Sequence, residues 1–189
     1  MTDRPSYTLE RDLELLEERK VDAFDIMGIE RHEWGEFHGQ RIHGYIDRVD
    51  RFAEGEVRVV DYKTGTVSDD EEKINDGNAA RIAEKLFKDE SPDRPTIALQ
   101  FFIYDKLMEQ EAAEGKILNS VYCLSNLFKE VPAVIPQSME FKRCVEERLA
   151  GLIDDLRNPE VPFRRVEERK SQMEFSPCDW CDFKIICGR

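Results

Sequence analysis

The sequence predicts an α/β (α+β) fold in which helices flank a central mixed β-sheet. Three segments rich in β-forming residues follow one another at 27–37, 41–52 and 57–63, separated only by short turns that contain glycine. A helical pattern precedes them, and helical and strand-like segments alternate after them. This order is typical of helices packed on one sheet.

The first element expected is a helix over residues 8–20. Thr8 is a suitable N-cap residue, and acidic residues occupy the first turn. Leu9, Leu13 and Leu16 recur at helical spacing, so they give the helix one apolar stripe.

The turns of the three-stranded segment fix its register. We expect His38-Gly39-Gln40 to form the first turn and Ala53-Glu54-Gly55 the second, with Gly55 in the left-handed conformation. The numbers of paired residues on the second and third strands then sum to 108, which sets Asp47 opposite Asp61. Lys63 lies two residues beyond Asp61 and projects from the same face.

The second half of the chain completes the sheet and its helical layer. A polar loop is expected at 66–78, and the later elements follow in order: helices at 79–88 and 97–114, strands at 117–124 and 131–135, and a helix at 138–157.

Composition restricts the functions that the chain can have. The 189 residues include 41 acidic and 28 basic side chains, which gives a net charge of −13. A chain this acidic is not a general nucleic-acid coating protein, because such binding requires phosphate neutralisation. No apolar run is long enough for a membrane span, and no apolar leader follows Met1, so we expect a cytoplasmic protein without membrane contact.

Asp47, Asp61 and Lys63 form a candidate catalytic group. Two facing carboxylates repel each other unless a cation lies between them, and their hard oxygens suit Mg²⁺ or Mn²⁺. A neighbouring ammonium can stabilise negative charge on a phosphate, so the group has the outline of a metal-dependent phosphodiesterase centre. The same spacing also fits a surface hairpin with its charges in solvent.

Four motifs in order resemble the PD-(D/E)XK nuclease superfamily. They are G-Y-I-D-R-V-D-R at 44–51, D-Y-K-T-G at 61–65, Q-F-F-I-Y at 100–104 and C-x2-C-x5-C at 178–187. The resemblance is to the RecB-like branch, in particular to the carboxy-terminal nuclease domain of AddB-type helicase–nuclease subunits, and covers residues 30–189.

This resemblance implies roles for the residues of the motifs. Asp47 and Asp61 would bind the catalytic Mg²⁺ or Mn²⁺, with the backbone carbonyl of Tyr62 as a third ligand. Lys63 would be the catalytic lysine.

The resemblance also implies supporting residues. Gln100 and Tyr104 would hold the site from a flanking helix, since residues four apart share a helix face. The alternative for Tyr104 is packing against its apolar neighbours. Glu30 would support the site from the first strand, although it also fits an edge-strand charge.

Three cysteines close to the C-terminus form a separate candidate metal group. Cys178, Cys181 and Cys187 resemble the last three ligands of a four-iron–four-sulfur cluster, and thiolates at this spacing also suit zinc. A fourth ligand is missing, because Cys123 and Cys144 fit core positions.

The histidine that RecB-like nucleases carry upstream of the sheet is also missing, because His32, His38 and His43 all fall within the β-segments. Either the chain is a fragment of a longer polypeptide or it is a diverged nuclease. We expect an N-terminal helix at 1–25, a nuclease core at 26–165 and a cysteine-rich tail at 166–189.

The leading functional hypothesis is a divalent-metal-dependent DNA nuclease of recombination and repair. The resemblance implies exonuclease action on DNA ends together with a helicase or a helicase-like subunit. Two alternatives remain: a catalytically silent scaffold module in a repair complex, and a cysteine-rich metal-binding interaction domain.

Overall fold

The computed structural model describes residues 4–88, 94–112, 116–124, 133–162 and 181–188. Its centre is a five-stranded sheet in the order β1-β2-β3-β4-β5. The strands are β1 (Asp25–Phe37), β2 (Gln40–Ala53), β3 (Glu56–Lys63), β4 (Ile117–Cys123) and β5 (Ala133–Val134). The pair β3–β4 is parallel and the other pairs are antiparallel, so the sheet is mixed, as predicted.

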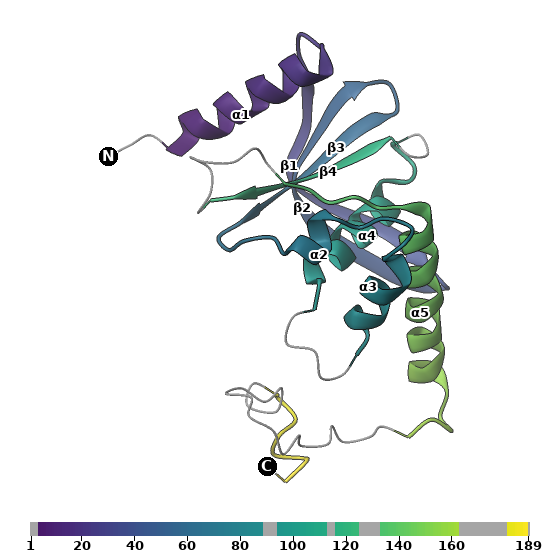
Figure 1. The fold of residues 1–189 in the computed structure, drawn as a ribbon. Coiled ribbons are helices and arrows are strands. Elements are labelled where there is room, and N and C mark those ends of the chain that lie inside the picture. Colours follow the sequence, from purple (N-terminus) through teal and green to yellow (C-terminus); the bar gives the residue numbers. More distant parts are fainter. Residues whose placement is uncertain (1–3, 89–93, 113–115, 125–132, 163–180, 189) are drawn as a thin grey trace.

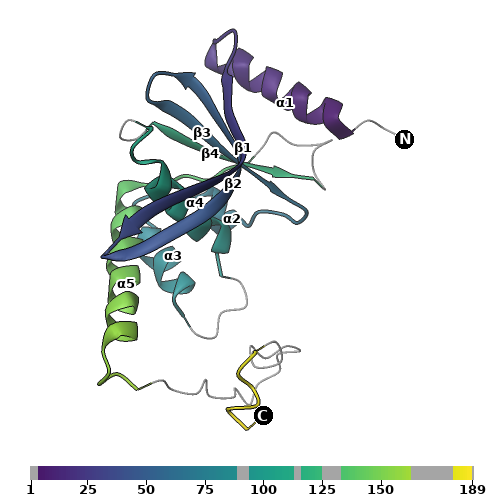
Figure 2. The same cartoon turned by 180° about the vertical axis from the view of Figure 1, so that it is seen from behind.

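Helices cover both sides of this sheet. They are α1 (Arg4–Arg19), α2 (Asp69–Glu72), α3 (Ala79–Leu86), α4 (Thr96–Met108) and α5 (Met139–Arg157). Figures 1 and 2 show α1 on one side of the sheet and the other four helices on the opposite side. Within the part of the chain that the structure describes, no helix has the length and apolar character of a membrane span.

Several predicted segments differ from the observed ones. The first helix, expected at 8–20, spans Arg4–Arg19, so Thr8 lies inside the helix and is not its N-cap. The loop expected at 66–78 contains the single turn of α2, because Ser68 and Glu71 form a reciprocal capping box. The helix expected at 97–114 ends at Met108, and a turn follows in which the Ala112 N–H donates to the Met108 carbonyl.

The two hairpin turns lie where they were predicted, but each has two residues instead of three, because Phe37 pairs with Gln40 and Ala53 with Glu56. His38 and Gly39 both have positive φ angles, 49° and 66°, which suits a two-residue hairpin turn, and Gly55 has a φ of 71°. The pairs from Arg48↔Val60 to Arg51↔Val57 all sum to 108. The predicted register is therefore confirmed for these pairs, although a register shift separates them from the turn. The ladder ends one pair before Asp47 and Asp61, which lie close because the Tyr62 N–H donates to the Asp47 side chain.

The alternation of β3 separates two environments. Val57, Val59 and the neighbouring helices build the main core on the α4 side of the sheet. Val60 packs with Tyr122 in a second, smaller cluster on the α1 side. Because β3 is buried on both faces, its charged side chains require charged or polar partners.

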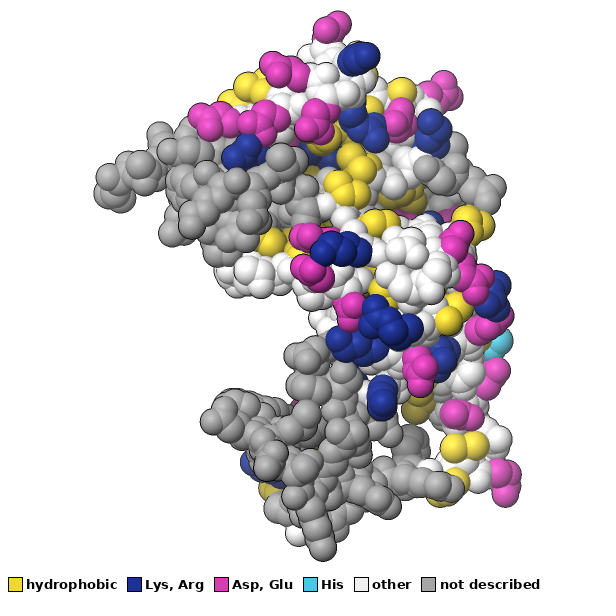
Figure 3. Space-filling model, viewed as in Figure 1, with side chains coloured by type: hydrophobic (Ala, Val, Ile, Leu, Met, Phe, Trp, Pro, Cys, Tyr) yellow, Lys and Arg dark blue, Asp and Glu magenta, His cyan; other side chains and the backbone are white. Residues whose placement is uncertain are grey.

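The predicted leucine stripe of the first helix is wrong. Leu9 and Leu13 are 61% and 51% exposed, whereas Asp12 is 5% exposed and faces the sheet. Helix α1 docks through this carboxylate because two buried arginines lie beneath it. Acidic side chains line the outer side of α1 in Figure 3.

Candidate active site

The structure brings the predicted catalytic group together on the α4 side of the sheet. The Tyr62 N–H of β3 donates to Asp47 Oδ2 of β2 across 2.8 Å. Lys63 Nζ lies 2.7 Å from Asp61 Oδ2. The register of β2 and β3 therefore assembles two carboxylates and one ammonium from residues 47–63, without contributions from distant parts of the chain.

Gln100 connects this group to α4. Its Nε2 donates to Asp61 Oδ1 across 2.9 Å, and its Oε1 accepts from Lys63 Nζ across 2.9 Å. One amide thus fixes the orientation of both side chains. The predicted position of Gln100 on the flanking helix agrees with these contacts.

Tyr104, one helical turn further along, extends the same network. Its hydroxyl accepts from Gln100 Nε2 across 2.6 Å and donates to the carbonyl of Tyr45 across 2.8 Å. Burial raises the pKa of Tyr104 to about 12, and the nearby carboxylates act in the same direction. The hydroxyl therefore keeps its proton at neutral pH and can hold both contacts.

The candidate catalytic group is partly buried and has an excess of negative charge, because it contains two carboxylates and one ammonium. Asp61 is 2% exposed. Burial raises the pKa of Asp61, Lys63 opposes this shift, and the charge of Asp47 adds to it. Apart from the Lys63 ammonium, Asp61 Oδ2 has no hydrogen-bond donor among the described residues.

These observations fit a divalent cation. Asp61 Oδ2 has an unused lone pair, and two carboxylates share a single ammonium. The carboxylates and the neighbouring Tyr62 backbone carbonyl are hard oxygen donors of the kind that Mg²⁺ and Mn²⁺ prefer. Among the described residues, no three His, Cys, Asp or Glu side chains converge as a metal site, so water or substrate oxygens would complete the shell.

Glu30 lies apart from this contact network. It falls between the pairs Ile29↔Arg48 and Arg31↔Ile46, which is level with Asp47 in the register. Its φ of 50° interrupts the extended backbone of β1, and its side chain is exposed. Its supporting role stays a prediction.

The remaining candidate ligands have other environments. His38 contacts Asp154 across 2.8 Å, on the far end of the β1–β2 hairpin. Cys181 is partly exposed and Cys187 is exposed, whereas Cys178 lies outside the described residues. The iron–sulfur or zinc assignment of the tail stays a prediction.

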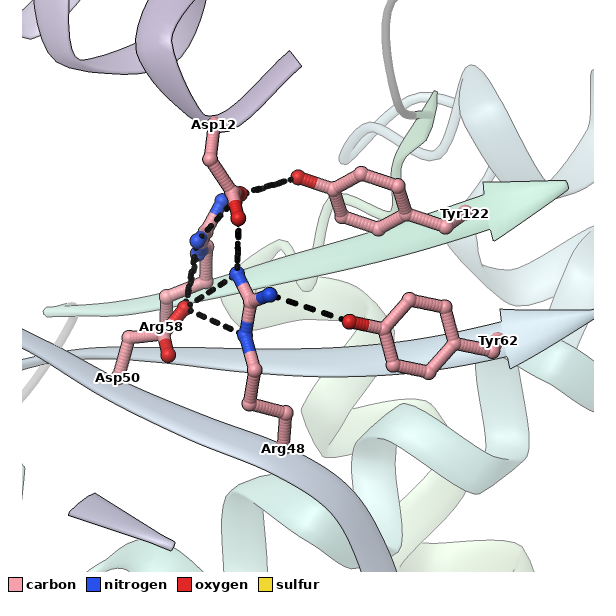
Figure 4. A network of polar contacts seen from close by, with 6 residues as sticks. All are labelled: Asp12, Arg48, Asp50, Arg58, Tyr62 and Tyr122. Carbon is pink, nitrogen blue, oxygen red and sulfur yellow. Dashed lines mark hydrogen bonds and ion pairs between the residues drawn. The ribbon is translucent and has the colours of Figure 1, made fainter. Parts of the chain in front are cut away.

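A second charged cluster lies on the α1 side of the sheet, and Figure 4 shows it from close by. We call it the α1-side network; its members, all with polar contacts to one another, are Asp12, Arg48, Asp50, Arg58, Tyr62 and Tyr122. Arg58 Nε donates to Asp50 Oδ2 across 2.7 Å, and its Nη2 donates to Asp12 across 2.8 Å. Arg48 Nη2 donates to Asp12 across 2.9 Å.

The α1-side network touches the candidate active site through Tyr62. The Tyr62 hydroxyl accepts from Arg48 Nη1 across 3.1 Å, while its backbone N–H donates to Asp47. Tyr62 of β3 thus contacts the α1-side network through its side chain and the candidate active site through its backbone.

Sequence reasoning missed Asp12 and Arg58 in this network. The alternation V-R-V-V at 57–60 was the available signal, because a charged residue between buried valines must have a buried partner. Arg48, which directly follows Asp47 in the sequence, belongs to this structural network through its ion pairs with Asp12 and Asp50.

The fold and the site define a class: a mixed sheet flanked by helices, with acidic residues and a lysine on neighbouring strands, as in PD-(D/E)XK nucleases. The chain matches the family model for the PD-(D/E)XK nuclease superfamily over residues 1–188. It therefore belongs to this superfamily. Searches of curated proteins and of solved structures find no match.

Proposed function

We propose that the chain is a divalent-metal-dependent DNA nuclease whose catalytic residues are Asp47, Asp61 and Lys63. Membership of the PD-(D/E)XK nuclease superfamily supports hydrolysis of phosphodiester bonds. The observation that carries the assignment is that the group holds two carboxylates, Asp47 and the buried Asp61, beside the single ammonium of Lys63. A structural ion pair balances its own charge, whereas this group keeps an excess of negative charge that a cation can neutralise.

In this proposal the chain's own residues bind and orient the reactants. Asp47 and Asp61 would hold the cation, which would supply Lewis-acid stabilisation of charge on the phosphoryl oxygens. Lys63 carries a positive charge at the edge of the same site, where it stabilises the charge that develops as water attacks phosphorus. The new P–O bond forms from the water, which releases a proton to solvent, the ester P–O bond breaks, and the leaving oxygen takes a proton from solvent.

Gln100 and Tyr104 act as positioning residues in this scheme. Gln100 bonds Asp61 and Lys63 at the same time, so it fixes the distance between the cation ligand and the lysine. Tyr104 anchors Gln100 to the backbone of β2. Such preorganisation lowers the reorganisation that the reaction would otherwise require.

The finer assignments rest on the resemblance of the motifs to RecB-like and AddB-type nucleases. They comprise exonuclease action on DNA ends, a role in recombination and repair, a helicase or helicase-like partner, and an iron–sulfur cluster at Cys178, Cys181 and Cys187. The net charge of −13 favours a substrate delivered by a partner over unaided tight binding to duplex DNA.

The test is a cleavage assay with labelled single-stranded and duplex DNA in Mg²⁺ or Mn²⁺. Wild type should cleave only with a metal, and Asp61→Ala and Lys63→Ala should each lower the rate by about 10²-fold or more. Asp69→Ala and Lys73→Ala are matched controls, because these residues form an exposed ion pair at 2.6 Å elsewhere on the surface. Cleavage that survives both site substitutions, or a metal-binding wild type without any cleavage, would favour a silent scaffold module.

A further inference from the structure

Two histidines of the β1–β2 hairpin face each other on the side of the hairpin that is turned away from α4. They are His32 of β1 and His43 of β2, both exposed, and we call them the histidine pair. The register pairs His32 with Tyr45 and Trp34 with His43, so the two histidines are diagonal neighbours across the strands. His32 Nε2 lies 3.2 Å from His43 Nδ1. The candidate active site uses neither residue.

Neighbouring aromatic rings hold both imidazoles of the histidine pair in place. Tyr45 is stacked on His32, with ring centroids 4.3 Å apart and planes at 11°. Trp34 lies 4.6 Å from His43 and 4.7 Å from His32 between centroids. The two facing nitrogens are therefore preorganised, and a ligand that binds both of them would immobilise little that is not already fixed.

The distance between the facing nitrogens matches that of two ligands on one metal ion. Zinc binds imidazole nitrogen at about 2.0–2.1 Å, so two nitrogens at the tetrahedral angle lie about 3.3 Å apart. The observed separation is 3.2 Å. A neutral imidazole can carry its proton on either nitrogen, so His32 Nε2 and His43 Nδ1 can both present a lone pair to the same ion.

Imidazole ligands select a different class of ion from the one that suits the candidate active site. Imidazole nitrogen suits Zn²⁺, Ni²⁺ and Cu²⁺, whereas Mg²⁺ and Mn²⁺ prefer oxygen. Within the described part of the chain, no third His, Cys, Asp or Glu side chain converges with the histidine pair. Two positions of a tetrahedral shell would therefore be open to water.

The charges around the histidine pair permit the approach of a cation. The guanidinium of Arg41 lies 4.7 Å over the Trp34 ring, but Glu36 is the register partner of Arg41 and brings a carboxylate beside it. The chain as a whole has a net charge of −13. A metal ion is therefore attracted by the overall field of the protein.

We propose that the histidine pair is a surface site for a transition-metal ion of the Zn²⁺, Ni²⁺ and Cu²⁺ class. His32 Nε2 and His43 Nδ1 bind the ion, and water fills the open positions. One ligand comes from β1 and the other from β2, so the ion also links the two strands of the hairpin. This site is separate from the candidate active site and does not depend on the proposed function.

The test measures Ni²⁺ binding through the fluorescence of Trp34, which contacts both imidazoles. All proteins carry Trp180→Phe, so that Trp34 is the single tryptophan of the chain. Ni²⁺ should quench the emission of Trp34 to saturation, and Zn²⁺ should compete with Ni²⁺ and restore the emission. His32→Phe and His43→Phe keep a ring but lose one ligand. Each should raise the half-saturating Ni²⁺ concentration about tenfold or more, because the second nitrogen binds as an intramolecular ligand.

His38→Asn is the matched control, because His38 contacts Asp154 and not the histidine pair. It should leave the quenching by Ni²⁺ unchanged, and Mg²⁺ should cause no quenching, since it prefers oxygen ligands. Circular dichroism melting checks that each variant is folded. Undiminished Ni²⁺ affinity in both His32→Phe and His43→Phe would overturn the proposal. A lack of saturable quenching at millimolar Ni²⁺ would also overturn it, and would identify the 3.2 Å contact as a hydrogen bond only.

Discussion

Two clusters of charged side chains lie on opposite sides of β3, and they differ in balance. The α1-side network contains two carboxylates and two guanidinium groups, at Asp12, Asp50, Arg48 and Arg58. The candidate active site contains two carboxylates and one ammonium. Both are buried or partly buried, but only the first balances its own charge.

The difference indicates what each cluster is for. A buried pair is tolerable when each charge has a partner with good geometry, and it then serves mainly to fix the arrangement of α1 on the sheet. A buried carboxylate without enough partners costs free energy of folding. Asp61 fits a group whose missing partner arrives as a cation, and the four predictions below test this contrast.

The largest expected effect concerns stability, at Arg58. This side chain has no solvent exposure and bonds Asp12 and Asp50 at once. Arg58→Ala should lower the free energy of unfolding by about 3–5 kcal/mol, because two carboxylates lose a buried partner. Urea denaturation measures this loss.

The control for Arg58 is Arg81→Ala, which removes an exposed partner of Asp70. Arg81→Ala should leave the unfolding midpoint unchanged, since exposed ion pairs contribute little. An equally small effect of Arg58→Ala would show that the α1-side network is not structural.

The next effect concerns catalysis, at Gln100. Its amide bonds Asp61 and Lys63 without being a cation ligand itself. Gln100→Ala should lower kcat by about 10–100-fold with little change in KM, as expected for a residue that orients others. Gln137→Ala, which removes an amide bonded to the Ala98 carbonyl, is the matched control. A rise in KM with an unchanged kcat would instead assign Gln100 to substrate binding.

A smaller effect of opposite sign to Arg58→Ala is expected at Asp61. In metal-free buffer, Asp61→Asn should raise the free energy of unfolding by about 1 kcal/mol, because it removes one of two carboxylates that lie beside a single ammonium at a site built for function. Thermal melting in EDTA measures the gain. A clear destabilisation would place Asp61 with the structural ion pairs instead.

The smallest expected effect is a pH dependence of the free energy of unfolding, which comes from Asp12. Burial opposes its ionisation, but hydrogen bonds from Arg48 and Tyr122 and the charge of Arg58 outweigh burial and lower the pKa of Asp12 below 3.8. A carboxylate of this kind stabilises the fold above its unfolded pKa, and the contribution is lost as the pH falls through the folded pKa.

Urea unfolding from about pH 6 to about pH 2 tests the Asp12 prediction, with Asp12→Asn as the comparison. The stability difference between wild type and Asp12→Asn should narrow as the pH falls below 3.8. A difference that stays constant with pH would contradict the assigned pKa direction.

The contrast between the two clusters also explains what the sequence could predict. The candidate site depends on local register: Gly39 and Gly55 define the turns, and the pairs that sum to 108 then follow. Gln100 and Tyr104 share a helix face by spacing alone. These relations can be predicted from the sequence, because each depends only on a turn or on the spacing within one helix or strand.

The α1-side network could not be predicted from the sequence, and the reason is physical. The burial of Asp12 depends on arginines that lie 36 and 46 residues further along the chain. A helix with exposed Leu9 and buried Asp12 contradicts the usual apolar pattern, and only the tertiary partners make it favourable. Local propensity contains no information on such partners.

The central claim is that Asp47 and Asp61 form a cation site, and Mn²⁺ titration calorimetry tests it most directly. Wild type should bind one Mn²⁺ per candidate site, Asp61→Asn should lose this binding, and Asp69→Asn, an exposed carboxylate of α2, should retain it. Mn²⁺ binding that is absent from wild type, or unchanged in Asp61→Asn, would contradict the claim.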